Sequence, residues 1–321
     1  MIREVTVISG KGGTGKTSLV GSLAYFAENK VMVDCDVDAA DLHLILRGNN
    51  LASHDFIGSQ KAVIDYELCN DCGLCLEYCR LDAIGERFET SEIDARRYYV
   101  DSLACEGCAI CAEFCPTRAI RMVDHVSGRW FLDDTKYGPL VHARLGIAEA
   151  NSGKLVSLLR KTARDLAEKN NHELIIIDGS PGIGCPVIAS LTGVDYALIV
   201  TEPTVAAIHD MERLLELTGH FGIHTGICIN KCDLNRDMTD KIVQLAATAK
   251  IEVLSRIPYD TSITRAQMAG LPYPEFRKDG VTKNFQELWN NLIEDMNRPH
   301  RRSRTNNVPL IQLGKPTEKE V

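Results

Sequence analysis

Short apolar runs alternate with longer amphipathic stretches over most of this 321-residue chain. The apolar runs are rich in β-branched residues and have the length of buried strands, whereas the amphipathic stretches repeat with the period of helices. The predicted strands are 5–9, 31–34, 174–178, 197–201, 226–229 and 253–257, and the predicted helices lie near 17–28, 153–169, 205–219, 239–250 and 284–296. This alternation predicts a doubly wound, mostly parallel α/β domain with crossover helices.

A duplicated unit interrupts the series after its second strand. Asp65, Cys69, Cys72, Cys75, Cys79, Ala83 and Ile84 recur 36 residues later as Asp101, Cys105, Cys108, Cys111, Cys115, Ala119 and Ile120. Because the strands on both sides read as one sheet, the unit is predicted to be an insertion. The predicted domains are a discontinuous α/β domain at 1–58 and 126–297, an inserted α+β domain at 59–125 and a mobile polar tail at 298–321.

The last predicted helix, 284–296, has an apolar stripe that fits either the core or a membrane surface. The acids Glu287, Glu294 and Asp295 lie on the same helix, whereas interfacial helices are usually rich in Lys and Arg. We therefore expect the stripe to pack on the core.

Charge and hydropathy exclude several classes of protein. The chain has 36 basic and 44 acidic side chains, a net charge of −8, which disfavours general nucleic-acid binding. Its longest apolar runs are far below the roughly 20 residues that span a bilayer, and MIREVTVISG lacks the features of a signal peptide. We expect a cytoplasmic protein without membrane association.

A glycine-rich segment follows the first predicted strand and precedes the first predicted helix. Residues 10–17 read GKGGTGKT, which has the spacing and the context of a phosphate-binding P-loop. Lys16 is expected to reach the β- and γ-phosphates, and Thr17 to ligate Mg²⁺. The predicted nucleotide-binding residues of this segment are Gly10, Lys11, Gly12, Gly13, Thr14, Gly15, Lys16, Thr17 and Ser18.

Eight of the twelve cysteines lie in the duplicated unit. Each copy has the spacing C-x2-C-x2-C-x3-C, which is the spacing of bacterial 4Fe–4S ferredoxins. Zinc is the alternative, but zinc sites usually pair CxxC units across longer spacers. The cysteines therefore predict two 4Fe–4S clusters. Arg80 stands where such ferredoxins usually have proline, and the segment between the copies is longer than in compact ones.

The P-loop resembles that of the deviant Walker A ATPases, the MinD, Mrp and nitrogenase iron protein group, whose motif is KGGxGKT. The resemblance implies an ATPase in which Lys11 crosses an ATP-bound homodimer to the partner's nucleotide. It also implies a water-orienting aspartate at Asp36, with Asp34 and Asp38 as weaker candidates. Asp178, at the end of LIIID, would hold Mg²⁺ through water.

The same resemblance suggests a base site. Asn230 follows a predicted strand where relatives place an asparagine against adenine, and Pro258 closes the next strand. A turn-capping role for Asn230 is the alternative.

The resemblance to two-cluster ferredoxins implies that the fourth cysteine of each motif serves the other cluster. One cluster would then bind Cys69, Cys72, Cys75 and Cys115, and the other Cys105, Cys108, Cys111 and Cys79. Cys185, seven residues after Asp178, is either a buried structural thiol or a metal-binding thiol at the dimer interface. Cys35, Cys228 and Cys232 are predicted to be packing residues.

Taken together, these features predict a slow, MgATP-hydrolysing iron–sulfur protein whose dimerisation couples ATP turnover to electron transfer with an unidentified redox partner. One alternative is a maturation ATPase that delivers an iron–sulfur cluster or another metallocofactor to a partner protein. Another is a redox-sensing positioning ATPase of the MinD type.

Overall fold

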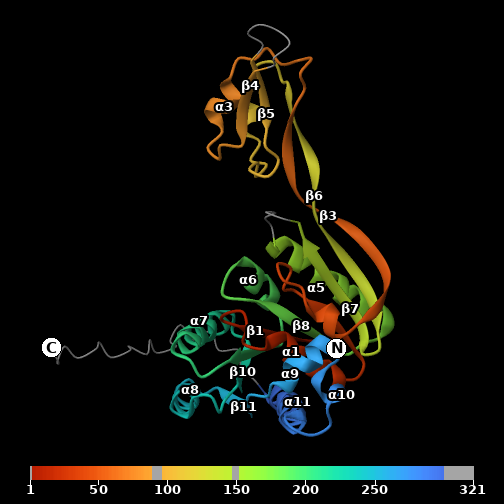
Figure 1. Ribbon diagram of the computed structural model, residues 1–321, viewed down its shortest axis with the longest axis vertical. Helices are drawn as coiled ribbons and strands as arrows, with labels where there is room; N and C mark the ends of the chain where they lie inside the picture. Colours follow the sequence, from red (N-terminus) through yellow and green to blue (C-terminus); the bar gives the residue numbers. More distant parts are fainter. Residues whose placement is uncertain (1, 89–95, 147–151, 300–321) are drawn as a thin grey trace, which may run out of the picture.

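A central sheet forms the body of the protein. The computed structural model describes residues 2–88, 96–146 and 152–299, and within them the strand order is β11-β10-β9-β1-β8-β2-β7-β6-β3. All six predicted strands are confirmed, as β1 (Arg3–Ser9), β2 (Lys30–Asp34), β8 (Leu174–Pro181), β9 (Tyr196–Thr201), β10 (His224–Asn230) and β11 (Glu252–Ile257). These strands run parallel and β7 (Gly138–Leu145) joins them in parallel beside β2. The expected doubly wound, mostly parallel α/β architecture is therefore present (Figure 1).

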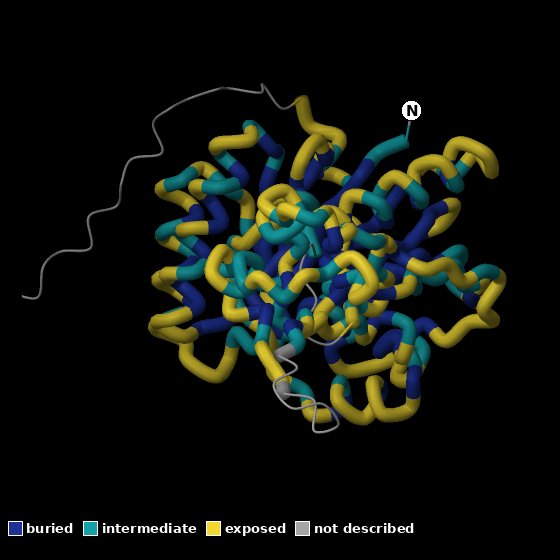
Figure 2. Tube along the Cα trace, turned by 90° about the horizontal axis from the view of Figure 1, so that it is seen from above, coloured by how far each residue is buried: buried dark blue, intermediate teal, exposed yellow. Residues whose placement is uncertain are grey.

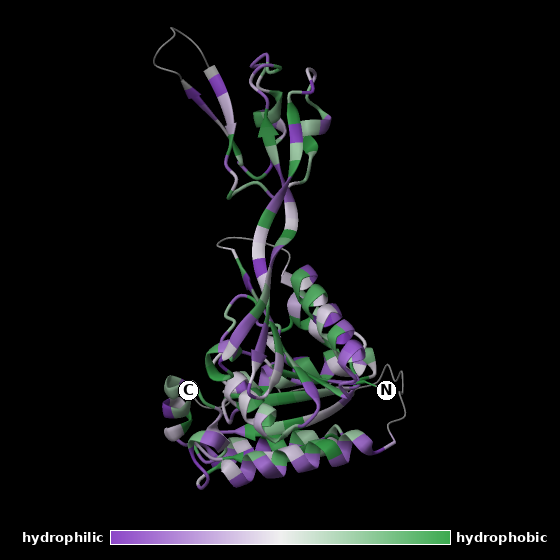
Figure 3. Cartoon of the chain, turned by 90° about the vertical axis from the view of Figure 1, so that its right-hand side faces the viewer, coloured by the Kyte–Doolittle hydropathy of each residue, from purple (hydrophilic) through white to green (hydrophobic). Residues whose placement is uncertain are grey.

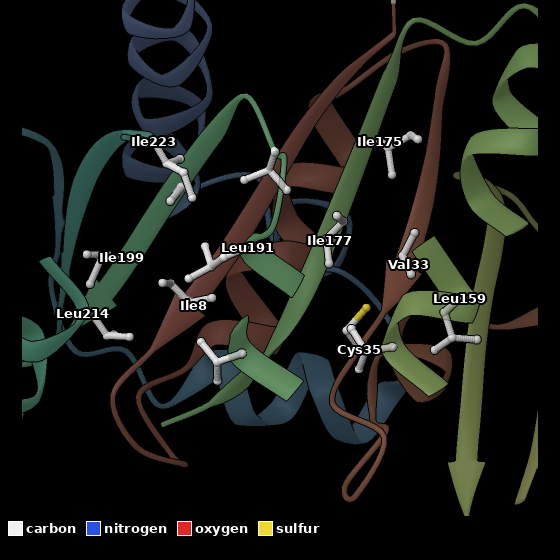
Figure 4. Packing of buried hydrophobic residues seen from close by; sticks show 14 of the residues in the cluster. Ile8, Val33, Cys35, Leu159, Ile175, Ile177, Leu191, Ile199, Leu214 and Ile223 are labelled. Atoms are coloured by element: carbon white, nitrogen blue, oxygen red, sulfur yellow. The ribbon is translucent and has the colours of Figure 1, made fainter. Parts of the chain in front are cut away.

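Helices cover both faces of this sheet. One face packs against α5 (Ser152–Asn170), α6 (Cys185–Leu191), α7 (Val205–Phe221) and α8 (Arg236–Thr248). The other packs against α1 (Lys16–Phe26), α2 (Leu42–Ile45), α9 (Ser262–Ala269), α10 (Tyr273–Phe276) and α11 (Thr282–Asn297). Successive strand residues alternate between the two cores, as Ile176 and Ile177 do. Figure 4 shows the first of these cores.

The burial of individual side chains confirms two of the sequence expectations. Phe285, Leu288 and Leu292 of α11 are buried, so the apolar stripe of the last helix is a core face. Cys35 and Cys228 are fully buried in the two cores, where they pack as expected. Segments of buried residues run through the body, and exposed residues lie mainly on its outside (Figure 2). No helix in the described part of the chain is long and apolar enough to cross a membrane.

A long antiparallel ribbon leaves the edge of the sheet and carries the cysteine-rich unit (Figures 1 and 3). Its strands, β3 (Gly48–Ile64) and β6 (Ile120–Thr135), pair from Gly48 with Thr135 to Ile64 with Ile120. The predicted domain boundaries at 58/59 and 125/126 fall inside this continuous ribbon. Beyond it lie α3 (Leu74–Tyr78), the antiparallel pair of β4 (Ile84–Phe88) and β5 (Arg96–Val100), and α4 (Ile110–Glu113).

The base of the ribbon is packed against the segment that follows β2. The ring of His142 on β7 stacks between His43 of α2, at 4.9 Å, and Phe131 of β6, at 5.0 Å. His142 Nε2 lies 2.9 Å from Asp133 Oδ2. Burial lowers the pKa of both histidines, so both rings favour the neutral form. The ribbon is thereby connected to α2, the helix that follows β2.

Candidate functional site

The predicted P-loop lies at the carboxyl ends of the central strands, where doubly wound sheets bind ligands. A cavity of about 410 Å³ opens there. Its lining includes Ser9, residues 11–18, Asp36, Asp38, Asp41 and Ser180. Gly13 and Gly15 adopt φ values of +80° and +90°, which residues with a side chain rarely adopt. A Cβ on Gly15 would also lie 2.4 Å from Asn230 Nδ2, so only glycine fits this turn.

Lys16 is enclosed by carboxylates at the base of the cavity. Its Nζ forms an ion pair with Asp178 and lies 3.7 Å from Asp36 Oδ2. Burial disfavours the charged lysine, but Asp178, Asp36 and Asp34 outweigh it and raise the pKa of Lys16. In the described part of the chain Asp178 Oδ2 is buried without a hydrogen-bond donor. A free buried carboxylate oxygen beside a phosphate-binding loop is a fitting ligand for hydrated Mg²⁺.

The three aspartates after β2 have different surroundings. Asp34 is fully buried and accepts hydrogen bonds from the backbone N–H groups of Asp36 and Leu42, both at 3.0 Å. Burial and the charge of Asp178 raise the pKa of Asp34 to about 8. Asp36 and Asp38 line the cavity and Asp36 is the closer to Lys16, since only its carboxylate comes within ion-pair range. Asp34 thus shapes the loop that presents Asp36.

Lys11 has a partner that the sequence did not indicate. Its Nζ lies 2.7 Å from one oxygen of Glu202, and Lys231 Nζ lies 2.8 Å from the other. The two lysines lower the pKa of Glu202 despite its burial. Lys231 Nζ also donates to the Gly13 carbonyl at 2.9 Å. The sequence feature that could have identified Glu202 is its position directly after the apolar strand β9.

Asn230 contacts the P-loop itself. Its Nδ2 donates to the Thr14 carbonyl at 2.7 Å, and its Oδ1 accepts from the Lys231 N–H at 3.0 Å. Neither Asn230 nor Pro258 lines the described cavity. The structure therefore places Asn230 behind the phosphate loop, and contact of Asn230 and Pro258 with a base stays a prediction.

The cysteine-rich unit has an internal two-fold repeat in its backbone. Asp65 N–H donates to the Ala119 carbonyl at 2.7 Å, and the equivalent Asp101 N–H donates to the Ala83 carbonyl at 2.8 Å. Three pairs of equivalent positions share a positive φ, namely Asp71 and Gly107, Gly73 and Ala109, and Asp82 and Arg118. Each copy thus folds into the same loop, helical turn and strand, and each ends against the other copy.

Two cavities in this unit are each lined by four cysteines. The first is lined by Cys69, Cys72, Cys75 and Cys115, and the second by Cys79, Cys105, Cys108 and Cys111. In each set, three cysteines come from one motif and the fourth from the other. Among the described residues no three His, Cys, Asp or Glu side chains converge on a single metal ion. A cubane cluster has a looser requirement, because each of its four cysteines binds a different iron.

The fourth cysteine of each motif accepts a backbone hydrogen bond. The N–H of Ala83 donates to Cys79 Sγ and the N–H of Ala119 donates to Cys115 Sγ, both at 3.3 Å. Burial raises the pKa of Cys75 to about 11, which disfavours a free thiolate there. Bound iron would remove this penalty, because a coordinated thiol is deprotonated by the charge of the metal. Apolar cavities with N–H donors to sulfur therefore suit a bound cluster better than free thiols.

Cys185 is exposed at the first residue of α6. The expectation of a buried structural thiol is therefore wrong, because α6 begins at the rim of the nucleotide cavity, where the neighbouring Pro186 is part of the lining. The remaining interpretation, a thiol at a dimer interface, stays a prediction. Most of the predicted polar tail, residues 300–321, lies outside the described residues.

Comparisons with known proteins agree with this fold. Residues 5–273 match the model of a family described as the CobQ/CobB/MinD/ParA nucleotide binding domain. An uncharacterized protein of Methanocaldococcus jannaschii is 34% identical over 73% of this chain and 80% of its own. A second uncharacterized protein of that organism is 26% identical over 90% and 97%.

Solved structures show the same fold at low identity. The septum site-determining protein MinD of Pyrococcus horikoshii, complexed with Mg-ADP, has a TM-score of 0.56 and 15% identity over 91% of this chain and 96% of its own. The cell division ATPase MinD of Pyrococcus furiosus has a TM-score of 0.54 and 17% identity over 92% and 99%.

Proposed function

Because the chain belongs to the CobQ/CobB/MinD/ParA nucleotide-binding family, we propose that it is an ATPase that couples ATP turnover to electron transfer through two 4Fe–4S clusters. The clusters would supply one-electron redox chemistry. The observation that carries the proposal is the grouping of the eight cysteines into two cavities of four, each with one cysteine from the other motif. A zinc site does not need this exchange between motifs.

The nucleotide site accounts for the ATPase half of the proposal. Backbone N–H groups of the P-loop and the N-terminus of α1 bind phosphate, and Lys16 neutralises its charge. Binding of phosphate gives Lys16 another anionic partner besides Asp178 and Asp36, which frees the Asp178 carboxylate for Mg²⁺ together with Thr17. Asp36 orients the attacking water from the cavity wall.

Lys11 is proposed to act in the partner's site of an ATP-bound homodimer. In the isolated chain Glu202 holds its ammonium group. Dimerisation would transfer Lys11 from Glu202 to the phosphates opposite, where a cation stabilises the transition-state charge. Lys11 would therefore reach its catalytic position only in the assembled homodimer.

A second candidate function, delivery of a cluster or another metallocofactor, is favoured by one observation. Cys185 is exposed beside the nucleotide cavity, and the proposed symmetric dimer would bring two copies of it together. The positioning role suggested by the name of the septum site-determining protein rests on similarity of fold at 15% identity. The complete cysteine sets favour electron transfer over both.

Lys11→Ala is expected to retain ATP binding and to lose at least about a thousandfold in kcat, as removal of a trans-acting cation does. ATP hydrolysis and nucleotide binding are measured on the same preparation. Mixing Lys11→Ala with Lys16→Ala should restore activity, because the first variant keeps Lys16 in its own nucleotide site and the second supplies Lys11 from across the interface. No restoration in a mixture shown to form heterodimers would contradict the role across the interface.

A further inference from the structure

The two cysteine cavities lie at different distances from the body along the ribbon. The pair Ala62 and Met122 contributes to the cavity of Cys79, Cys105, Cys108 and Cys111, which we call the proximal set. The pair Ile64 and Ile120, further from the body, contributes to the cavity of Cys69, Cys72, Cys75 and Cys115, the distal set. The ribbon enters the body at its other end (Figure 3). The proximal set therefore lies between the ATPase body and the distal set.

A buried lysine contacts the proximal set. Lys61 is 7% exposed, and its Nζ donates to the carbonyl oxygen of Cys105 at 2.8 Å. The loop that follows Cys105 packs closely on β3, since a Cβ on Gly107 would lie 2.1 Å from the Gln60 carbonyl oxygen. The residue equivalent to Lys61 in the second copy is Arg97, whose guanidinium lies 5.7 Å from the centre of the Tyr66 ring. The proximal set thus has a buried positive charge against a ligating residue.

Each set has an acidic neighbour. Glu106, next to Cys105, lines the proximal cavity, where the buried ammonium group of Lys61 opposes its charge, whereas in the distal set an acid contacts a sulfur ligand directly. Asp71 Oδ1 lies 3.6 Å from Cys69 Sγ, and the equivalent residue of the proximal set is Gly107, which has no charge. Each set receives one matched N–H donor to sulfur, so those bonds do not distinguish the two. Thr117 Oγ1, 3.7 Å from Cys115 Sγ, adds a neutral dipole to the distal set, which is weaker than a full charge.

We propose that Lys61 and Asp71 make the two clusters electrostatically unequal, so that the proximal cluster has the higher reduction potential. The inference rests on the proposed function. A positive charge in a low-dielectric site favours the reduced, more negative cluster, and a negative charge disfavours it. An electron delivered by a low-potential one-electron donor protein then passes from the distal cluster, which is oxidised, to the proximal cluster, which is reduced. Electron flow is directed toward the ribbon and the ATPase body.

The test is a potentiometric titration of the full-length protein, purified without oxygen and followed by electron paramagnetic resonance. The wild type should show two unequal couples. Lys61→Met should lower only the higher reduction potential, that of the proximal cluster. The expected change is tenfold in the ratio of reduced to oxidised cluster at fixed ambient potential, or about 59 mV. The difference between the two reduction potentials then narrows. Lys61→Arg should keep the wild-type gap, whereas Asp71→Asn should raise the lower couple and narrow the gap from the other side.

Unchanged couples in Lys61→Met at full iron content would overturn the inference, as would a wider gap. If Lys61→Met loses iron, the difference between the two reduction potentials is measured in Lys61→Arg and Asp71→Asn instead. A difference that Asp71→Asn leaves unchanged or widens overturns the inference. Failure of the proposed function is distinguishable, because the wild-type protein would then contain no 4Fe–4S iron to titrate.

Discussion

Replacing Lys16 with methionine is expected to lower the free energy of unfolding of the nucleotide-free protein by about 3–5 kcal/mol, besides abolishing ATP hydrolysis. Lys16 is 5% exposed and Asp178 is fully buried, and Asp34 is buried beside them. Without the ammonium group these carboxylates remain in the interior without a cation. Chemical denaturation monitored by far-UV circular dichroism, with no nucleotide present, measures the loss.

The loss should also depend on pH. Burial and the charge of Asp178 raise the pKa of Asp34 to about 8, and Lys16 opposes this shift. A carboxyl group whose pKa is higher in the folded than in the unfolded state costs stability as the pH rises through that interval. Lys16→Met should therefore be destabilised more at about pH 8 than at about pH 5, where Asp34 is protonated and uncharged.

Lys231→Met is the matched control for this experiment. Lys231 also pairs with a carboxylate beside the P-loop, but its side chain is 25% exposed, so its removal should cost only about 0–1 kcal/mol. Equal losses in the free energy of unfolding of the two variants would contradict the claim that Lys16 neutralises buried carboxylates at the floor of the cavity.

Pairs of cysteine substitutions should separate the two cysteine sets. Cys72→Ser with Cys115→Ser removes two ligands of the distal set, although the two residues belong to different motifs. This double variant should keep the proximal cluster and about four irons per chain. Cys72→Ser with Cys79→Ser removes two residues of one motif but one ligand from each set, and both clusters should be impaired. Iron and sulfide analysis with visible spectra measures the outcome.

The opposite ranking of these double variants would show that each motif holds its own cluster. That result would contradict the exchange of the fourth cysteine. Zinc in place of iron and sulfide in the wild-type protein would reject the clusters altogether.

The sequence predicted the parallel core because its strands, such as 174–178, are continuous apolar runs that only a buried sheet accommodates. The ribbon was not predicted. Most of the β3 residues from Gly48 to Asp55 are exposed, and a solvated two-stranded ribbon lacks the apolar face that marks a strand. The boundaries drawn at 59 and 125 followed the change in composition, which lies within the ribbon.

The candidate site was predictable where local spacing determines it. The P-loop is a continuous motif, and the two cysteine motifs are visible as a repeat. Glu202 was missed because its role depends on Lys11 and Lys231, which come from other strand ends. Lys61 was missed because only the tertiary fold brings its ammonium group to the carbonyl of Cys105, 44 residues away.

The coupling of ATP turnover to redox chemistry is tested most directly on anaerobically purified protein, by following its iron content and cluster reduction potentials while MgATP, an apo-acceptor protein and a chelator are added. The account predicts that about eight irons per chain remain bound and that MgATP shifts at least one reduction potential. Release of a cluster to the acceptor on addition of MgATP, or potentials that MgATP leaves unchanged, would contradict it.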